Sequence, residues 1–535
     1  MKGKVGAILL AAVMALSLAA CGGSSSGESA DKPAGETAGA SGEAAEVKTA
    51  GGPDTLVVGL DSDIVNLDPS STEDYASGQV LSQIFDTLFC FDKDLKFESK
   101  LVEDYEYEDD LTLVVHLKPG IKFSNGDELT AEDVIYSFKR SKYIANSAMQ
   151  FELYDDVNST VRDKYTAVLK TTEPFSPQIY KFVWYVTSIV NKKAVEATGG
   201  VVTEESCIGT GPYKLVKWYQ GDRVELTANE NYQFEDLPKI KNITFRAILE
   251  SNSRAMALES GDIDIAYKIA AADATRFESA PDIDLVRAAG LNTCYLALNN
   301  QKPPFDNKLV RQALFHAIDR ENAVKIGFGG AGVIANTFFP QDIEGAATDI
   351  PLPEYNPEKA KELLKEAGYD EANPLTFTII AQSSNQNRLN MATFIQENLA
   401  AVGIKAEIDA VEQGVFTDTY VGGLHEAMVL GWTDVTVEPE MILGNYDYTR
   451  PVLFKTWGYK NQEYTDLLKE AILSVDHEHT LECYHKCQEI LHEDVPSIPI
   501  VVAYLDEAKK PYVQGFDIDR SWECMNLETV YFDEP

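Results

Sequence analysis

The amino-terminal fifty residues differ so sharply from the rest of the chain that they confine the folded body to the residues after them. Lys2 and Lys4 precede an unbroken run of small and apolar residues from Ile8 to Ala20. As a helix this run would span about 20 Å, which is shorter than the ~30 Å hydrocarbon core of a bilayer. The pattern therefore predicts a signal peptide over residues 1–20 and not a membrane-spanning helix.

The signal segment ends in Leu18-Ala19-Ala20-Cys21. A leucine three positions before a cysteine, with two small residues between them, resembles the bacterial lipobox. In signals of that kind the cysteine is diacylated and becomes the first residue of the mature protein. Cys21 is therefore the predicted lipidation site, and its acyl chains would anchor the protein at ~0.8 kcal/mol per buried CH₂.

Residues 21–53 are predicted to be a flexible linker. They are rich in Gly, Ser, Ala and Glu and contain no aromatic residue, so they cannot bury a core. The segment Gly23–Gly27 matches G-x-S-x-G, a motif that marks a nucleophile only on a strand-to-helix elbow. In a linker the match predicts no catalytic serine.

Composition excludes several classes of protein. Lys and Arg number 46 and Asp and Glu number 85, which gives a formal net charge of −39. A surface this acidic repels phosphate backbones, so nucleic-acid binding is not expected. The seven cysteines are too sparse for a disulfide scaffold; they lie at positions 21, 90, 207, 294, 483, 487 and 524.

Strand and helix patterns alternate along the body. Leu56–Leu60 reads as a buried strand, and Phe377–Ile380, Met391–Ala401 and Ile404–Ile408 read as strand, helix and strand. This alternation is typical of α/β architecture.

Two helix starts are marked by capping residues. Thr130 and Asp133 form a capping box, in which the side chains of the N-cap and N3 residues pair with free backbone N–H groups. Asn356-Pro357 begins a second helix, with proline at the first helical position and Gly368 just past the end.

Six segments, in order along the chain, resemble one known family. They are Asn66–Pro69 with Asp86–Phe89; Lys100–Glu103 through Lys118–Gly126; Leu129–Ser137; Ile208–Tyr213; Asn292–Asn299; and Pro303–Asp306 with Val310–Ala313 and Ala317–Arg320. The family is that of the extracytoplasmic solute-binding proteins of peptide-type ABC importers, family 5. The resemblance extends from about Leu56 to about Tyr504.

The resemblance implies an α/β fold of two lobes, similar to the type II periplasmic binding proteins of cluster C, with an extra subdomain and a hinged cleft. Lobe I would combine residues 54–80, 205–290 and 508–535, the extra subdomain would be 81–204, and lobe II would be 291–507. The chain would cross between the lobes near Gly290 and near Asp506, which would form the hinge.

A clamp for many different peptides must hold what all peptides share, and the α-ammonium end needs a carboxylate. In the family, an Asp shortly after a Gly-Trp pair often takes this end. This chain has Trp432 followed by Asp434, one residue earlier than usual, and then by Glu438 and Glu440. Any of the three acids is a candidate ligand contact, and Trp432 is a candidate for stacking on the ligand or for the core.

Four more residues are candidates for ligand contact. Tyr75 and Ser77 follow the first strand, near the mouth of the cleft in family members, and Tyr295 lies where the chain leaves the hinge. Arg388 is the candidate partner of the ligand carboxylate. Dipeptide-binding relatives carry an Arg about where this chain has Gln382, a departure that argues against a strict dipeptide ligand.

The alternatives are an enzyme and a receptor for another cargo. Gly327–Gly332 matches G-x-G-x-x-G but follows a helical pattern instead of a strand, and there is no Walker A or H-E-x-x-H motif, so no catalytic residue and no cofactor is predicted. A metal-chelate receptor, for example for a nickel complex, and an oligosaccharide receptor remain open because some relatives bind such solutes.

The histidines and cysteines between His477 and His492 raise the question of a metal site. His479, Cys483 and Cys487 share one helix face, but ligands spread over ~12 Å of one helix cannot all meet one ion at ~2.0–2.3 Å. The segment is therefore predicted to be a structural helix, with no metal.

These observations together predict a monomeric, lipid-anchored substrate-binding lipoprotein on the extracytoplasmic face of a bacterial membrane, or in the periplasmic space of a Gram-negative cell. It would capture short peptides in an interlobe cleft and deliver them to an ABC permease. The energy for transport would come from partner ATPase subunits, because the chain carries no nucleotide motif.

Overall fold

The structure is a computed structural model that describes residues 50–234, 236–450, 455–474, 476–521 and 524–533. All of these residues belong to one compact unit, Val47–Glu534. The predicted signal peptide, Cys21 and all but the last residues of the predicted linker lie outside the described residues. Within the described part of the chain, no helix combines the length and the apolar character needed to cross a bilayer.

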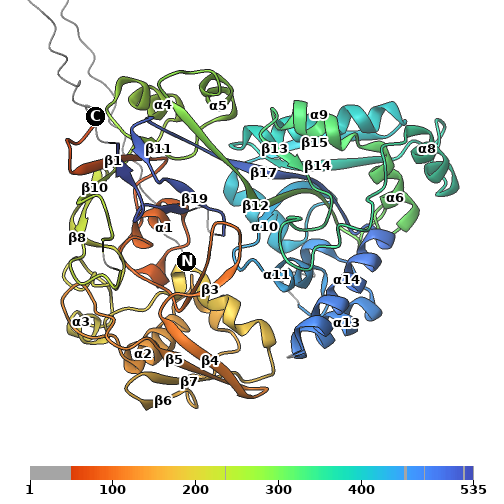
Figure 1. Ribbon diagram of the computed structural model, residues 1–535. Coiled ribbons are helices and arrows are strands. Elements are labelled where there is room, and N and C mark those ends of the chain that lie inside the picture. The colour runs from red at the N-terminus through yellow and green to blue at the C-terminus, as the bar shows by residue number, and fades with distance from the viewer. Residues whose placement is uncertain (1–49, 235, 451–454, 475, 522–523, 534–535) are drawn as a thin grey trace, which may run out of the picture. The chain divides into compact units, whose positions relative to one another are not determined.

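One mixed sheet joins segments from most of this unit (Figure 1). Its strands are, in spatial order, β15 (Lys405–Val411), β14 (Thr376–Gln382), β16 (Ala427–Thr433), β12 (Asp284–Leu298), β17 (Ser497–Lys509), β11 (Ile265–Ala266), β1 (Thr55–Leu60), β10 (Asn242–Ala247), β9 (Arg223–Ala228) and β8 (Tyr213–Tyr219), and β13 (Gly332–Ile334) also pairs with β17. Three parallel strands lie on each side of the antiparallel pair β12–β17. The pair β12–β17 is therefore the connection between two strand groups.

The pairing of β12 with β17 is interrupted midway by a bulge. The register shifts between Ala289 and Thr293, and a bulge bends a strand and increases its local twist. A Cβ atom on Gly290 would lie 2.9 Å from the backbone oxygen of Ala503, so this approach requires glycine. Arg287 pairs with Asp506 beside the bulge, with 3.1 Å between Nη2 and Oδ2. The bulge includes Gly290, near which the sequence predicts that the chain crosses between lobes.

Short helices accompany the strand group that contains β1. They are η1 (Pro69–Ser71), α1 (Tyr75–Leu81), α4 (Ser251–Ser260) and α5 (Ala271–Phe277). Apolar residues of β1, β10 and α1 share one core, and α4 and α5 pack into a second core on β1 and β11. The C-terminal strands pair as β18 (Val513–Gln514) with β21 (Tyr531–Phe532) and β19 (Asp517–Asp519) with β20 (Cys524–Asn526).

Strands within the predicted subdomain form a separate four-stranded sheet with a core of its own. The strands are β4 (Val102–Asp109), β5 (Thr112–Leu117), β7 (Thr166–Lys170) and β6 (Thr160–Asp163) in spatial order, beside the hairpin β2 (Phe89–Phe91) and β3 (Phe97–Ser99). The helices are α2 (Ala131–Ser141), α3 (Lys192–Ala197), η2 (Ala148–Phe151), η3 (Ser176–Val183) and η4 (Tyr185–Thr187). The capping box at the start of α2 is confirmed: the Thr130 N–H donates to Asp133 Oδ2 at 3.0 Å.

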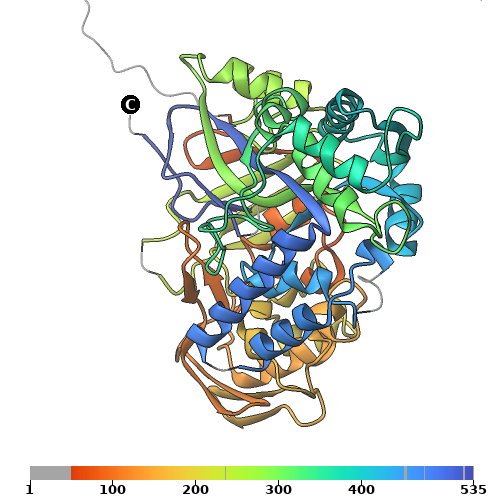
Figure 2. The ribbon, with the colours of Figure 1, turned by 90° about the vertical axis from the view of Figure 1, so that its right-hand side faces the viewer.

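Helices accompany the strand group β14–β16. They are α6 (Lys308–Ala317), α7 (Arg320–Asn322), the π-helical turn η5 (Ala323–Gly327), α8 (Pro357–Glu366), α9 (Gln386–Ala401), α10 (Gln413–Gly422), α11 (Pro439–Leu443), η6 (Gly444–Tyr446), α13 (Gln462–Leu473) and α14 (His477–Asp494). Helices α13 and α14 lie side by side (Figure 2). Helix α9 begins five residues before the predicted start because Asn385 caps it, accepting the Arg388 N–H at 3.1 Å.

An apolar cluster connects the region 81–204 with the region that follows β12. Phe91 belongs to this cluster, and Tyr180 and Val183 pack against it. On the other side it contains Tyr446 and Tyr484. The two regions are therefore in direct apolar contact in this structure.

Three of the segments that resemble the family meet at Asp86. The Thr210 hydroxyl donates to Asp86 Oδ2 at 2.7 Å, and Lys100 Nζ lies 2.9 Å from Asp86 Oδ1. A Cβ atom on Gly209 would lie 1.9 Å from the backbone oxygen of Ile84. The segment around Gly209 is thus constrained by the close approach of two backbones.

Candidate ligand-binding site

Three acids follow the end of strand β16 and gather in a small volume. The Asp434 N–H donates to the Leu291 backbone oxygen of β12 at 3.1 Å, which places Asp434 directly after the central strands. Glu438 is the N-cap of α11, and its Oε2 accepts the Glu440 N–H at 2.8 Å. Asp434, Glu438 and Glu440 are all buried. The structure therefore brings together the three acids that the sequence identifies.

One carboxylate oxygen of Asp434 has no hydrogen-bond partner among the described residues. Its Oδ1 accepts the N–H groups of Thr436 and Glu438 at 3.3 and 3.4 Å. Its Oδ2 is buried and has no hydrogen-bond partner among the described residues. Because the side chain is 0% exposed, burial raises the pKa of Asp434 to about 7, although the hydrogen bonds from Glu438 and Thr436 oppose the shift. A buried carboxyl with one open oxygen favours a cationic partner.

The two glutamates are held by different partners. Glu440 accepts hydrogen bonds from Arg450 and from Lys181, whose Nζ lies 3.4 Å from Oε2. Burial by itself would raise the pKa of Glu440, but these two cations outweigh it and hold the pKa well below the usual range. Glu438 accepts the Tyr484 hydroxyl, and burial together with the charge of Glu440 raises its pKa. The cluster thus contains three acidic side chains and two basic ones.

Tyr75 reaches the same strand end from the other strand group. Its hydroxyl lies 3.4 Å from Thr433 Oγ1, the oxygen that also accepts Asn292 Nδ2 at 2.8 Å. Lys268 Nζ lies 4.0 Å from the centroid of the Tyr75 ring, a cation–π contact. Tyr75 is therefore close to the residue that precedes Asp434.

Arg388 approaches β16 from helix α9. Its Nη1 donates to Gln382 Oε1 at 3.3 Å, so the guanidinium lies beside the side chain of Gln382. A Cβ atom on Gly431 would lie 2.5 Å from Arg388 Nη2. The guanidinium is thus next to the residue that precedes Trp432.

The other predicted contacts are less accessible in this structure. Trp432 is half-buried and packs against the apolar cluster that contains Tyr446 and Tyr484. Tyr295 is buried in that cluster, and its hydroxyl donates to the Phe338 backbone oxygen. Ser77 is buried, and its hydroxyl oxygen accepts the Val65 N–H at 2.9 Å. Tyr295 and Ser77 therefore support local structure, and their contact with a ligand stays a prediction.

Several residues of the site were not identified from the sequence. Lys181, Arg450 and Tyr484 complete the acid cluster, and Asn292 and Lys268 complete the contacts around Thr433 and Tyr75. Asn292 lies in a segment that resembles the family, which is a signal that could have singled it out. The others come from remote segments with no local motif.

A cavity of about 500 Å³ lies elsewhere in the unit, beside the hairpins β2–β3 and β19–β20. Asp86, Lys100, Asp519 and Glu528 are among its lining residues. None of the predicted contact residues lines it. The acid cluster is therefore separate from this cavity.

Comparison with known proteins places the chain among solute-binding proteins. Residues 96–452 match the family model "Bacterial extracellular solute-binding proteins, family 5 Middle". The chain is 32% identical to the glutathione-binding protein GsiB of Shigella boydii over 487 residues, which cover 88% of this chain and 94% of that protein.

Solved structures show the same fold. HbpA2 of Haemophilus parasuis superposes with a TM-score of 0.80 at 26% identity and covers 90% of this chain and 100% of its own. The periplasmic binding protein DppA of Helicobacter pylori, in complex with the peptide STSA, superposes with a TM-score of 0.72 at 27% identity and covers 90% and 98%. The predicted α/β fold of the periplasmic binding proteins, with an extra subdomain sheet, is confirmed by these likenesses.

Proposed function

The chain belongs to family 5 of the bacterial extracellular solute-binding proteins, and from this membership we propose that it captures short peptides with a free α-ammonium group at Asp434. Proteins of this family bind solutes for ABC transporters and are not enzymes. The proposal adds the class of solute and the residue that recognises it.

The open oxygen of Asp434 carries the proposal. Asp434 Oδ2 is buried without a partner among the described residues, although buried polar atoms are nearly always paired. An ammonium group would supply charge and hydrogen bonds to this oxygen and would favour the ionised carboxylate. Lys181 and Arg450 already pair with Glu440, and burial together with the charge of Glu440 raises the pKa of Glu438, so the negative charge for the ammonium group would come from Asp434.

Closure around the peptide would use the bulge in the pair β12–β17. The proposed lobes, 54–80 with 205–290 and 508–535 on one side and 291–507 on the other, are connected by these strands. The proposed subdomain 81–204 contributes Lys181, which contacts Glu440 in lobe II. A ligand that contacts both lobes stabilises the closed form, because only a difference in affinity between two forms shifts their populations.

The relatives support a peptide as cargo. GsiB is named for glutathione, which is a tripeptide, and DppA of Helicobacter pylori is seen with the peptide STSA. The proposed ligand class is therefore short peptides, delivered to an ABC permease that is powered by ATPase subunits.

We also propose that Cys21 carries the lipid anchor on the extracytoplasmic membrane face. A Cys21→Ser variant should then lose labelled palmitate and leave the membrane fraction.

Calorimetry with matched peptides tests the recognition of the α-ammonium group. We expect Ser-Thr-Ser-Ala, trialanine or glutathione to bind, and the N-acetylated form of each binder to lose affinity. Removing one partner of a buried charge pair costs about 2–5 kcal/mol, so the loss should be at least about 30-fold. Asp434→Asn should bind the free and acetylated forms with nearly equal, weak affinity.

The control variant is Asp273→Asn, which changes a buried acid on α5 that pairs with Arg276. It should bind free peptides as the unaltered protein does. Equal binding of free and acetylated peptides by the unaltered protein would refute the role of Asp434. Binding of neutral oligosaccharides but of no peptide would refute the proposed solute class.

A further inference from the structure

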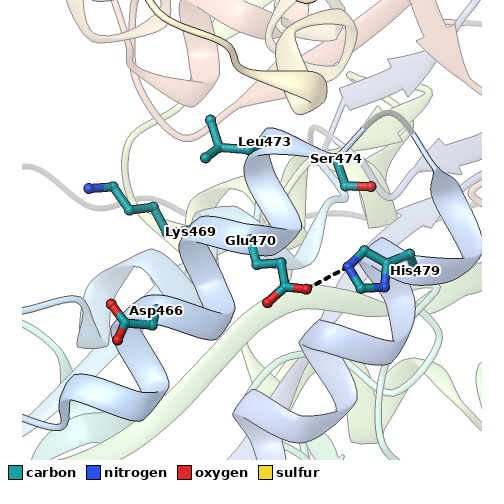
Figure 3. A pocket seen from close by; sticks show the side chains of 6 residues that line it. All are labelled: Asp466, Lys469, Glu470, Leu473, Ser474 and His479. Atoms are coloured by element: carbon teal, nitrogen blue, oxygen red, sulfur yellow. Dashed lines mark hydrogen bonds and ion pairs between the residues drawn. The ribbon is translucent and has the colours of Figure 1, made fainter.

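Glu470, His479 and Cys483 bring a carboxylate, an imidazole and a thiol together where α13 and α14 pack against each other. His479 Nε2 lies 2.8 Å from Glu470 Oε1 and 3.7 Å from Cys483 Sγ. One ligand atom from each of the three residues lies within 4.8 Å of the other two. Figure 3 shows Glu470 and His479 facing each other across the two helices.

The helices make this convergence a consequence of their packing. His479 and Cys483 are four residues apart on α14, so they lie on the same face of the helix. Glu470 lies in the last turn of α13, which ends at Leu473, shortly before α14 begins at His477. Two ligands from one helix and a third from its neighbour avoid the problem that one helix alone cannot surround an ion.

From this geometry we propose that Glu470, His479 and Cys483 form a zinc site that is separate from the peptide-binding site. Ligands at ~2.0–2.3 Å from a tetrahedral zinc ion lie about 3.3–3.8 Å from one another. The distance of 3.7 Å between His479 and Cys483 already meets this requirement. The carboxylate of Glu470 would move about 0.5 Å away from His479 to open the 2.8 Å hydrogen bond to the same range, and its oxygen already lies within 4.8 Å of Cys483 Sγ.

The ligand types favour zinc or a similar transition metal over Mg²⁺ and Ca²⁺. Thiolate and imidazole are ligands of Zn²⁺ and Co²⁺, whereas Mg²⁺ and Ca²⁺ need mostly oxygen. The chain's net charge of −39 raises the local concentration of cations.

The site is accessible to an ion. A hollow of about 420 Å³ is lined by Glu470 and His479 together with Asp466 and Ser474. Lys469 also lines it, but its side chain points away from His479 in Figure 3. Cys483 is buried, whereas Glu470 and His479 are partly exposed, so an ion would enter from the side of Glu470 and His479. Three protein ligands leave the fourth position to water.

The proposed ligands are not the three residues that the spacing along α14 rules out as joint ligands of one ion. One ion cannot be bound by His479, Cys483 and Cys487 together, and the structure agrees, because Cys487 Sγ is directed to the Tyr464 backbone oxygen at 3.8 Å. The third ligand of the proposed site is Glu470 of the preceding helix. Its contribution becomes visible only when α13 and α14 are placed side by side.

Titration of the purified protein with ZnCl₂ and CoCl₂ tests the proposal. We expect one zinc ion per chain by calorimetry, and a cobalt complex with thiolate-to-metal charge-transfer absorption in the near ultraviolet. Loss of a group that only supports a metal ligand typically costs 10–100-fold in affinity. Loss of a ligand itself, in Glu470→Gln, His479→Gln or Cys483→Ser, should cost at least about tenfold. Cys483→Ser should also abolish the charge-transfer absorption.

Matched controls distinguish this site from other metal-binding groups. His485→Gln removes a similarly exposed imidazole of the same helix, whose ring nitrogens face Asp349 and Glu489. Cys90→Ser removes a half-buried thiol elsewhere. Both variants should keep the affinity and the spectrum of the unaltered protein.

The outcomes decide the proposal independently of peptide binding. Glu470 and His479 are partly exposed polar residues, so their glutamine variants should keep the circular dichroism spectrum even if Cys483→Ser does not. The proposal is wrong if no zinc binds, if cobalt shows no thiolate band, or if the Glu470 and His479 variants bind zinc as tightly as the unaltered protein. None of these results depends on whether Asp434 binds a peptide.

Discussion

Lys181 Nζ lies 3.4 Å from Glu440 Oε2, although 259 residues separate the two along the chain. Lys181 belongs to η3, in the region 81–204. Glu440 belongs to α11, which follows strand β16 along the chain. Glu440 is almost fully buried, and Lys181 is 20% exposed. This ion pair adds a charged contact between regions that also meet through apolar side chains and through a hydrogen bond from the Ser176 hydroxyl to the Ile472 backbone oxygen at 3.2 Å.

Lys181→Met should weaken peptide binding, because in the proposed hinge motion this contact forms only when the two lobes close. A hydrogen bond to a charged group contributes about 1.5–3 kcal/mol, so affinity should fall at least about tenfold. Calorimetry measures the affinity, and solution scattering should show a larger average radius of the unliganded variant. Lys192→Met is the control, because Lys192 pairs with Glu132 on an exposed surface. An unchanged affinity would show that the ion pair does not contribute to closure.

Peptide affinity should depend on pH through Asp434. Burial raises its pKa to about 7, and a peptide ammonium group requires the ionised form. Affinity should therefore rise with pH up to about 7, and fall again above about 8 as the peptide amine loses its proton. Below pH 7, binding should release a proton, which calorimetry in buffers of different ionisation enthalpy detects. Asp434→Asn should abolish the rise below pH 7; a rise that persists would assign it to another group.

The raised pKa of Asp434 also predicts how the stability of the unliganded protein changes with pH. The folded state holds a proton on Asp434 up to about pH 7, whereas the unfolded chain releases it near pH 4. The contribution of Asp434 to the free energy of unfolding is therefore present below about pH 4 and is lost as the pH rises to about 7. Asp434→Asn should show a smaller decrease over this interval in urea unfolding experiments. An equal decrease in both proteins would contradict the raised pKa.

Gly209→Ala should strongly destabilise the fold. The added Cβ would lie 1.9 Å from the Ile84 backbone oxygen, and backbone cannot move aside as the end of a flexible side chain does. Overpacking of this kind costs at least about 1–3 kcal/mol. Gly414→Ala is the control, because a Cβ there meets nothing within 4 Å and alanine favours helix α10. Urea midpoints of the two variants should therefore move in opposite directions.

Local sequence signals were sufficient for many elements of the fold. Asn356-Pro357 predicted the start of α8, and Asn356 Oδ1 accepts the Lys359 N–H at 3.0 Å there. Such signals fail for β12 and β17, whose pairing depends on a partner about two hundred residues away. The predicted strand Ile498–Tyr504 is therefore only part of β17, which continues to Lys509. The family resemblance supplied the α/β fold of the periplasmic binding proteins, but not the order and pairing of its strands.

The candidate site was predictable only where its residues are neighbours in the sequence. Asp434, Glu438 and Glu440 follow one strand, and the structure brings them together. Lys181 could not be identified, because the residues around it resemble an ordinary amphipathic segment and its partner is remote. The burial of Tyr295 could not be predicted either, because nothing in the residues next to it indicates that its hydroxyl donates to the Phe338 backbone oxygen.

Arg388 should distinguish peptides by their carboxyl end. Its guanidinium lies between Gln382 and Gly431, beside the strand that leads to Asp434, so it can pair with a carboxylate while Asp434 holds the ammonium end. Amidation of the peptide carboxyl group should then weaken binding to the unaltered protein about tenfold, the typical effect of losing a hydrogen bond between charged groups. Arg388→Gln should bind acid and amide forms equally. Gln382→Ala serves as the control, because it removes the neighbour of the guanidinium and leaves the charge in place. If the unaltered protein binds both forms equally, Arg388 is not the partner of the carboxylate, and its contact with Gln382 is structural.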